Sequence, residues 1–228
     1  MEYLRWGVLG ASKFALEHLT PAIQLAKNNR FSALASGSRE KVAAFVQLEP
    51  TAKLYNSYHE LLADDGVDAI YIPLPNTMHV DWTIRAIKSG KHVLCEKPIA
   101  MRAEEINELI KLRDDTGLIV AEAYMIVHHP QWQKAKQIVQ SGVLGELIQV
   151  DSVFSYNNQS DLKNIRNNSK LGGGGLPDIG VYTLGSVRFV TGEEPVAIQH
   201  ADIKYKNGVD VWALAAFDFP KFKFTSIT

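Results

Sequence analysis

The chain has 228 residues, 46% of them hydrophobic and 21% charged, which supports one or two buried cores and excludes a disordered or fibrous protein. The 24 lysines and arginines nearly match the 25 aspartates and glutamates, so no net charge attracts nucleic acid or an anionic membrane. The single cysteine, Cys95, excludes an internal disulfide and zinc sites built on several thiolates. Because the sequence shows no signal-peptide pattern and no apolar segment of bilayer length, we expect a cytoplasmic protein.

Short apolar segments alternate with longer segments of helical period in the first half of the chain. This pattern is typical of a parallel sheet with crossover helices. The expected strands are Leu4–Leu9, Ser32–Ala35, Ala69–Ile72, His92–Cys95 and Ile119–Ala123. The expected helices are Phe14–Lys27, Glu40–Leu48, Val80–Ser89 and Ala103–Thr116. We therefore predict an α/β, doubly wound Rossmann-type domain over residues 1–123.

The pattern changes after residue 123. Helices are expected over Trp132–Ser141 and Pro177–Val190, with a strand-like segment at Leu147–Tyr156 and a polar loop at residues 157–175 between them. Three further strand-like segments follow, at Ala197–Tyr205, Val209–Phe219 and residues 222–228. These elements predict a second, α+β domain over residues 124–228, with an open and mostly antiparallel sheet.

The turn after the first strand reads GVLGASKFA, from Gly7 to Ala15. Small residues stand where a dinucleotide pyrophosphate must approach the backbone at a helix N-terminus. The pattern G-x-G-x-x-G/A places Gly10, Ser12 and Ala15 at its three fixed positions, so a serine replaces the middle glycine. The turn is either a cofactor site, with Lys13 and Phe14 beside the phosphates, or a tight packing turn.

The second strand ends in ASGSR, without the carboxylate that usually accepts hydrogen bonds from the ribose in NAD-selective sites. Ser36, Ser38 and Arg39 suit a 2′-phosphate instead, because a guanidinium group binds phosphate oxygens in a bidentate way. The alternative for Arg39 is a solvent-facing residue at the start of a helix. We expect NADP as the cofactor, with NAD as the alternative.

Two further strand ends carry candidate residues, in the segments IPLPNTMH and CEKP. Open parallel sheets bind their ligands beyond the carboxyl ends of the strands. The residues expected to line a cofactor cleft there are Leu74, Asn76, His79, Glu96 and Lys97.

Together these segments resemble the glucose-fructose oxidoreductase, inositol dehydrogenase and MocA-like family (Gfo/Idh/MocA), and within it the dihydrodiol and NADP-dependent sugar dehydrogenases. The matching segments are GVLGASKFA, PNTMH, HVLCEKP, EAYMIVHHP and GGGGLPDIGVY. The resemblance implies an enzyme that moves a hydride between a nicotinamide cofactor and a sugar, polyol or diol. It also implies that Lys97 lies beside the substrate hydroxyl and that the D-x-G-x-Y segment supplies Asp178 and Tyr182.

Asp178 and Tyr182 stand four residues apart on one expected helix, so their side chains share a face. An ammonium group favours a nearby phenolate, so we expect Tyr182 to act as general acid or base beside Lys97, while Asp178 orients the substrate. In the competing interpretation Tyr182 is a packed helix residue and Asp178 a carboxylate favoured by the helix dipole. No metal site is expected, because the adjacent histidines at 128 and 129 lack partners at ligand spacing.

Members of this family continue for roughly a hundred further residues, so the resemblance implies an incomplete second sheet, either in a truncated chain or in one whose sheet another subunit completes. Relatives often associate sheet to sheet, which predicts a homodimer or higher oligomer through the C-terminal sheet. The alternatives to an enzyme are a truncated dinucleotide-binding module without turnover and a non-redox protein of the same fold.

Overall fold

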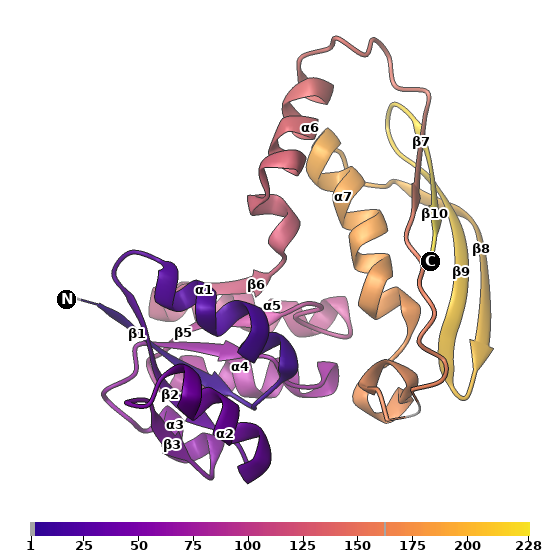
Figure 1. The fold of residues 1–228 in the computed structure, drawn as a ribbon. Coiled ribbons are helices and arrows are strands. Elements are labelled where there is room, and N and C mark those ends of the chain that lie inside the picture. The colour runs from indigo at the N-terminus through magenta and orange to yellow at the C-terminus, as the bar shows by residue number, and fades with distance from the viewer. Residues whose placement is uncertain (1–2, 162) are drawn as a thin grey trace. The chain divides into compact units, whose positions relative to one another are not determined.

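The computed structural model describes residues 3–161 and 163–228, and the chain divides into two compact units, Met1–Ala123 and Tyr124–Thr228. Figure 1 shows the first unit in indigo to magenta and the second in rose to yellow. Each unit contains its own sheet.

The sheet of the first unit has six parallel strands in the order β3-β2-β1-β4-β5-β6. The strands are β1 Leu4–Leu9, β2 Asn29–Ala35, β3 Lys53–Tyr55, β4 Ala69–Ile72, β5 His92–Glu96 and β6 Val120–Ala123. The helical segments are η1 Ala15–Leu19, α1 Thr20–Leu25, α2 Arg39–Leu48, α3 Tyr58–Leu62, η2 Asn76–Met78, α4 His79–Lys88 and α5 Ala103–Thr116. The predicted doubly wound sheet is confirmed, and its strand order reverses between β1 and β4.

The strand β4 is enclosed on both faces of this sheet. Ile70 and Ile72 belong to a core cluster with residues of α3 and α4, whereas Tyr71 belongs to a second cluster with residues of α1 and α2. Alternate residues of a strand point to opposite faces, so the two clusters are the two layers between sheet and helices. A strand buried on both faces is apolar throughout, which explains why the sequence signal for β4 is continuous rather than alternating.

Two short elements, β3 and α3, were not predicted. Their lengths are three and five residues, too short for a helical or alternating period to stand out. The expected helix Phe14–Lys27 is also modified, because it contains a π-helical turn, η1, in which Thr20 donates to the carbonyl of Ala15. Pro21 follows at once and has no N–H to donate, so the ordinary α-helical bonding is interrupted at this point.

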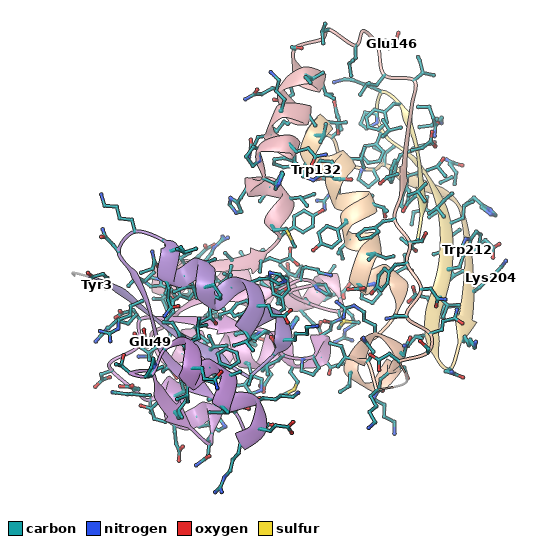
Figure 2. The ribbon with its side chains drawn as sticks, in the orientation of Figure 1. Tyr3, Glu49, Trp132, Glu146, Lys204 and Trp212 are labelled. Atoms are coloured by element: carbon teal, nitrogen blue, oxygen red, sulfur yellow. The ribbon has the colours of Figure 1, made fainter. Side chains whose placement is uncertain are left out.

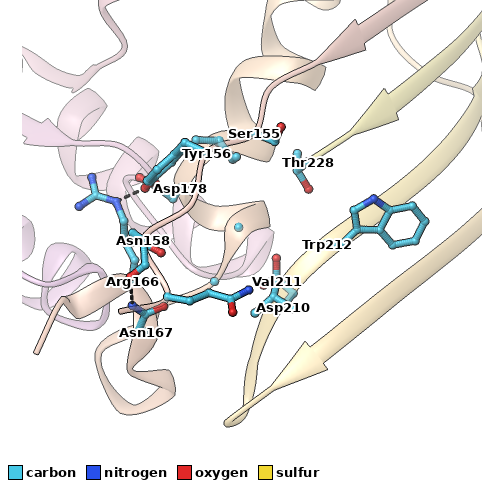
Figure 3. A pocket seen from close by; sticks show the side chains of 14 residues that line it. Ser155, Tyr156, Asn158, Arg166, Asn167, Asp178, Asp210, Val211, Trp212 and Thr228 are labelled. Atoms are coloured by element: carbon cyan, nitrogen blue, oxygen red, sulfur yellow. Dashed lines mark hydrogen bonds and ion pairs between the residues drawn. The ribbon is translucent and has the colours of Figure 1, made fainter. Parts of the chain in front are cut away.

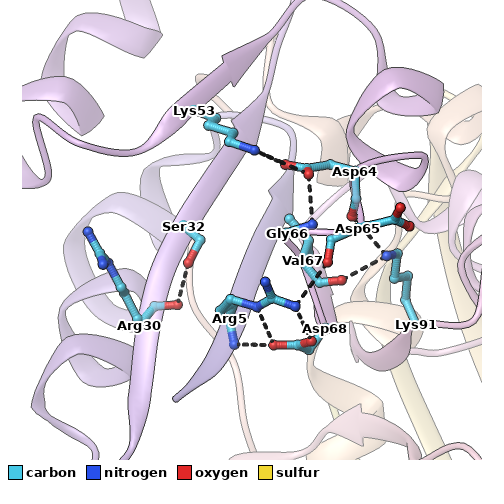
Figure 4. Close-up of polar contacts among 10 residues, drawn as sticks. All are labelled: Arg5, Arg30, Ser32, Lys53, Asp64, Asp65, Gly66, Val67, Asp68 and Lys91. Carbon is cyan, nitrogen blue, oxygen red and sulfur yellow. Dashed lines mark hydrogen bonds and ion pairs between the residues drawn. The ribbon is translucent and has the colours of Figure 1, made fainter. Parts of the chain in front are cut away.

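The amino-terminal ends of the strands are joined by ionic contacts (Figure 4). Arg5 of β1 binds Asp68 through two hydrogen bonds of 2.7 and 2.8 Å. Lys53 of β3 pairs with Asp64 at 3.0 Å. The ammonium group of Lys91, which is 6% exposed, donates to the carbonyls of Asp64 and Val67 at 2.9 and 2.8 Å. The loop before β4 is thereby fastened to the starts of β1, β3 and β5.

Asp64 gives this network a pH dependence. Although burial opposes the charged form, hydrogen bonds from Gly66, Lys53 and Tyr55 lower the pKa of the Asp64 carboxyl to about 2. A carboxyl whose pKa is lower in the folded state stabilises the fold above its unfolded pKa near 4, and this contribution is lost as the pH falls toward 2.

We therefore expect Asp64→Asn to lower the free energy of unfolding of the first unit by about 2 kcal/mol at pH 7 and by roughly half as much at pH 3. Urea unfolding followed by circular dichroism at both pH values measures this difference. The neighbouring Asp65→Asn is the matched control and should change little. An Asp64→Asn effect of the same size at both pH values would contradict the assignment.

The second unit has a four-stranded sheet in the order β7-β10-β9-β8, in which β10 pairs parallel with β7 and the other pairs are antiparallel. The strands are β7 Gln149–Val153, β8 Ala197–Lys206, β9 Val209–Asp218 and β10 Lys223–Ile227. The helical segments are η3 Met125–His128, α6 Pro130–Gln140, η4 Ile165–Asn167, η5 Ser169–Leu171, η6 Leu176–Gly180 and α7 Val181–Thr191. The predicted mixed α and β architecture with a mostly antiparallel sheet is confirmed.

The core of this unit lies between α7 and the sheet, where Val187 packs with Phe219, Phe222 and Phe224. The edge strand β8 is almost wholly exposed, and on it Lys204 lies over the Trp212 ring of β9 at 4.7 Å (Figure 2). Association of two copies through this sheet stays a prediction. In the described part of the chain, the helices lack the combination of length and apolar character that crossing a bilayer requires.

Candidate functional site

The loop after β1 is a tight turn that leads directly into a helix. Gly10 has a φ of +97°, a backbone conformation that favours glycine, and a Cβ there would also lie 2.9 Å from Cδ2 of Leu74. The Oγ of Ser12 accepts the N–H of Ala15 at 3.0 Å, which makes Ser12 the cap of the helix. Its own proton remains a donor, as do the first peptide N–H groups of a helix. The serine at the usual glycine position therefore suits an anion-binding turn.

Two other expected contacts lie on the surface of this turn. Lys13 has a side chain that is 84% exposed and lies 3.8 Å from Glu17. Phe14 is 41% exposed, and its ring packs against His18. The cation and the helix N-terminus are thus both accessible to a phosphate, and the residues present fit a dinucleotide pyrophosphate.

The end of β2 holds two serines with different structural tasks. Ser36 accepts the N–H of Ser38 at 3.2 Å, and Ser38 accepts the N–H of Lys41 at 3.5 Å as the cap of α2. Arg39 follows as the first residue of α2, and it is exposed. Arg39 is therefore both a helix-start residue and an accessible guanidinium beside a helix N-terminus, which fits a phosphate on the ribose.

The loops after β4 and β5 carry Leu74 and Asn76 on one strand end and Lys97 on the other. His79 was expected to line a cleft, but the structure places it elsewhere. His79 is 0% exposed, and its ring lies 2.7 Å from the carbonyl of Pro98 and 2.8 Å from that of Leu74. It lies beneath the two loops and holds them, because its ring contacts a carbonyl of each.

Glu96, the last residue of β5, is linked to the core. The hydroxyl of Tyr71 donates to Oε1 of Glu96 at 2.6 Å. Burial raises the pKa of the Glu96 carboxyl, although Tyr71 and Lys97 oppose the shift. Burial and the Glu96 charge also raise the pKa of Tyr71. The side chain that precedes Lys97 is thus anchored from the neighbouring strand.

In the second unit, Asp178 and Tyr182 lie on one continuous helix formed by η6 and α7. The Tyr182 ring packs against Tyr124 at 5.4 Å and against Phe154 at 5.9 Å between centroids. Asp178 accepts a hydrogen bond from the hydroxyl of Tyr156. Phe154 and Tyr156 are two residues apart and their ring centroids lie 6.4 Å from each other, so Asp178 and Tyr182 both contact the same short segment.

Arg166 completes the surroundings of Asp178. Its Nε lies 2.7 Å from Oδ2 of Asp178, whose side chain is only 11% exposed. Burial and the hydrogen bond to Asp178 raise the pKa of Tyr156 to about 12, so Tyr156 stays a neutral donor. A guanidinium and a phenol on one carboxyl group fix the orientation of Asp178.

A cavity of about 110 Å³ adjoins this cluster (Figure 3). Its polar lining includes Asn158, Gln159, Asn167, Asp210 and Thr228. The sequence analysis did not single out Tyr156, the last residue of the predicted strand-like segment Leu147–Tyr156, or Arg166, which lies in the predicted polar loop.

Four consecutive glycines bring Arg166 to Asp178. The N–H of Gly174 donates to the carbonyl of Arg166 at 2.9 Å. A Cβ on Gly173 would lie 2.4 Å from that oxygen and 2.6 Å from the carbonyl oxygen of Ile165. The glycine segment therefore packs directly on the turn η4 and is not a flexible linker.

We expect Gly173→Ala to lower the free energy of unfolding of the second unit by about 1–3 kcal/mol, because backbone atoms rather than a mobile side chain must give way. Gly37→Ala is the control, since no atom lies within 4 Å of a Cβ at that position. Thermal unfolding of both variants measures the difference. Equal stability of the two variants would contradict the close packing described here.

A parallel sheet in the order 3-2-1-4-5-6 with a glycine turn after β1 defines the first unit as a dinucleotide-binding Rossmann domain in architecture. Residues 4–124 match the family model described as an oxidoreductase family with an NAD-binding Rossmann fold, and residues 132–228 match the GFO/IDH/MocA C-terminal domain. The chain therefore belongs to the Gfo/Idh/MocA family of oxidoreductases, and the resemblance seen in the sequence is confirmed.

Among curated relatives, an uncharacterised oxidoreductase of Rhizobium meliloti is 40% identical over 96% of this chain and 66% of its own length. A dTDP-3,4-didehydro-2,6-dideoxy-alpha-D-glucose 3-reductase of Streptomyces violaceoruber is 36% identical over 95% of this chain and 63% of its own length. The chain thus spans less than two thirds of the length of these two relatives. D-xylose 1-dehydrogenase (NADP(+)) 2 of Haloferax volcanii is 35% identical over 83% of this chain and 58% of its own length.

Solved structures are similar along almost the whole chain. A 3-ketoreductase from Actinomadura kijaniata, in complex with TDP-benzene and NADP, has a TM-score of 0.87 and 27% identity over 99% of this chain and 68% of its own. An aldose-aldose oxidoreductase from Caulobacter crescentus, complexed with glycerol, has a TM-score of 0.85 and 28% identity over 99% and 70%. Within the described ranges, we find no group of three or more histidine, cysteine, aspartate or glutamate side chains that could hold a metal ion.

Proposed function

We propose that this protein is an NADP-dependent oxidoreductase that transfers a hydride between the nicotinamide ring and a hydroxyl or carbonyl carbon of a sugar, polyol or diol. One observation carries the proposal: the candidate cofactor residues follow the carboxyl ends of β1, β2, β4 and β5, which meet at one edge of the parallel sheet. The relatives named as an NADP-dependent xylose dehydrogenase and a sugar 3-reductase support the same class of reaction.

The cofactor would be held by three groups of residues in the first unit. The turn at Gly10 and Ser12 would bind the pyrophosphate through backbone N–H groups and the serine hydroxyl. Arg39, with Ser36 and Ser38, would bind the 2′-phosphate. The loops that carry Leu74, Asn76, Glu96 and Lys97 would line the nicotinamide end.

The bound nicotinamide gives or accepts the hydride, so the protein has to position the substrate and move one proton. In oxidation the substrate hydroxyl must lose its proton as the hydride leaves carbon, and in reduction the new alkoxide must gain one. Tyr182 is the proposed acid and base. The Lys97 ammonium would stabilise negative charge on the phenol oxygen and on the substrate oxygen.

Asp178 would bind a substrate hydroxyl as an acceptor rather than move the proton. Its pairing with Arg166 supports this division of tasks, because a carboxylate beside a guanidinium resists protonation. The amide-lined cavity next to Asp178 suits the hydroxyl-rich body of a sugar, which both donates and accepts hydrogen bonds.

The cofactor preference depends on Arg39. We expect Arg39→Ala to weaken NADPH binding by roughly tenfold and to change NADH binding little, because only NADPH carries the 2′-phosphate. Isothermal titration with both cofactors measures the two affinities. Arg30→Ala, at the opposite end of β2, is the control. Equal losses for both cofactors would reject the role of Arg39.

The chemistry depends on Lys97 and Tyr182. We expect Lys97→Ala and Tyr182→Phe each to lower kcat by roughly a hundredfold or more, with the NADPH Kd changed less than about threefold. Absorbance of the reduced nicotinamide, screened against sugars, polyols and diols, measures turnover. Lys88→Ala and Tyr205→Phe, both at exposed positions, are the matched controls. Cofactor binding by the wild type without turnover on any substrate would contradict the proposed reaction.

A further inference from the structure

His79 is a buried histidine that the proposed chemistry does not use. It is the first residue of α4, it is 0% exposed, and both of its ring nitrogens face backbone carbonyls. Nδ1 lies 2.7 Å from the oxygen of Pro98, and Nε2 lies 2.8 Å from the oxygen of Leu74. The two carbonyls belong to the loops that follow the neighbouring strands β4 and β5.

The two distances place an acceptor oxygen at each nitrogen of the ring. A carbonyl oxygen only accepts hydrogen bonds, and a neutral imidazole has a single N–H. In a neutral ring one nitrogen lone pair would face a carbonyl lone pair at 2.7 or 2.8 Å, in a place that water does not reach. The doubly protonated ring satisfies both oxygens at once.

A buried cation needs a compensating charge. Glu96 is the carboxyl that interacts electrostatically with His79, and a positive ring opposes the rise that burial causes in the pKa of Glu96. Tyr71 and Cys95 remain neutral, since burial raises the pKa of each. The positive end of the α4 dipole disfavours a cation at the first helical position. The two carbonyls and Glu96 offset this unfavourable interaction.

The remaining acidic groups nearby are engaged elsewhere. Asp81 of α4 accepts a hydrogen bond from Arg85 at 2.9 Å. Glu122 of β6 accepts the N–H of Ile99 at 2.8 Å. Lys97 precedes the Pro98 carbonyl and adds a second positive charge near Glu96.

We propose that His79 is a positioning residue that, as a buried imidazolium, ties the loop after β4 to the loop after β5 and thereby fixes Lys97. The tie acts through the carbonyl of Pro98, the residue directly after Lys97. The effect on Lys97 rests on the proposed function, whereas the charge of the ring does not.

The charge is tested in the protein without cofactor by nitrogen-15 NMR of labelled histidine at pH 7. Seven histidines are present, and the signals of His79 are those missing from His79→Gln. We expect both ring nitrogens to carry protons, with slow solvent exchange because the ring is buried. A His79 ring with a single N–H at pH 7 would overturn the proposal.

The positioning role is tested with two isosteric variants. In His79→Asn the side-chain amide nitrogen occupies the place of Nδ1 and keeps the contact with Pro98. In His79→Gln the side-chain amide nitrogen occupies the place of Nε2 and keeps the contact with Leu74. We expect kcat to fall about tenfold to a hundredfold in His79→Gln and much less in His79→Asn, with the NADPH Kd nearly unchanged in both.

Equal kcat values for the two folded variants would overturn the role through Pro98. His200→Gln, on the exposed strand β8, controls for the substitution itself and should match the wild type. If His79→Gln fails to fold, hydrogen exchange at the Ile99 amide is compared between His79→Asn and the wild type instead. Because His79→Asn retains the Pro98 contact, faster exchange in that variant would also overturn the role. Absence of wild-type turnover contradicts the proposed function instead, and leaves the NMR result standing.

Discussion

All six strands of the first sheet run in the same direction, and this shared direction gives the sheet two different edges. At the amino-terminal edge, Arg5, Lys53 and Lys91 are paired with carboxylates and carbonyls and serve stability. At the carboxyl edge, loops and helix starts present backbone N–H groups and exposed cations. A site for an anionic cofactor can therefore vary at one edge without disturbing the ionic contacts at the other.

The sequence predicted the elements that carry a clear apolar or helical pattern and missed those that do not. The bounds of β1, β4 and α5 are as expected, because β1 and β4 are mostly apolar segments and α5 is a long helical period ended by glycine. The elements β3 and α3 depend on neighbouring strands and on the Ser57 cap rather than on a period of their own. The π-helical turns at η1 and η6 were missed for a related reason, since no side-chain pattern distinguishes them from an α-helix.

The site was predicted unevenly. Gly10 was predicted from the G-x-G-x-x-G/A pattern, and Asp178 and Tyr182 from the resemblance of the D-x-G-x-Y segment to the family; their functional roles stay predictions. His79 was assigned to the right motif but to the wrong surroundings, since the sequence cannot show that both ring nitrogens meet carbonyls from two separate loops. Tyr156 and Arg166 were missed, because their task consists of contacts to Asp178 across a folded loop.

Because Leu176–Gly180 is a π-helical turn, the direction in which the Tyr182 side chain points depends on how many residues this turn contains as well as on which residues they are. A π-turn holds about one residue more than an α-turn, and each residue of an α-helix advances the chain by about 100° around its axis. Losing one residue between Asp178 and Tyr182 would leave the two side chains on one face of the helix, but it would rotate Tyr182 by about 100° around the helix axis relative to Asp178. This segment should therefore accept substitutions during evolution more readily than changes in its length.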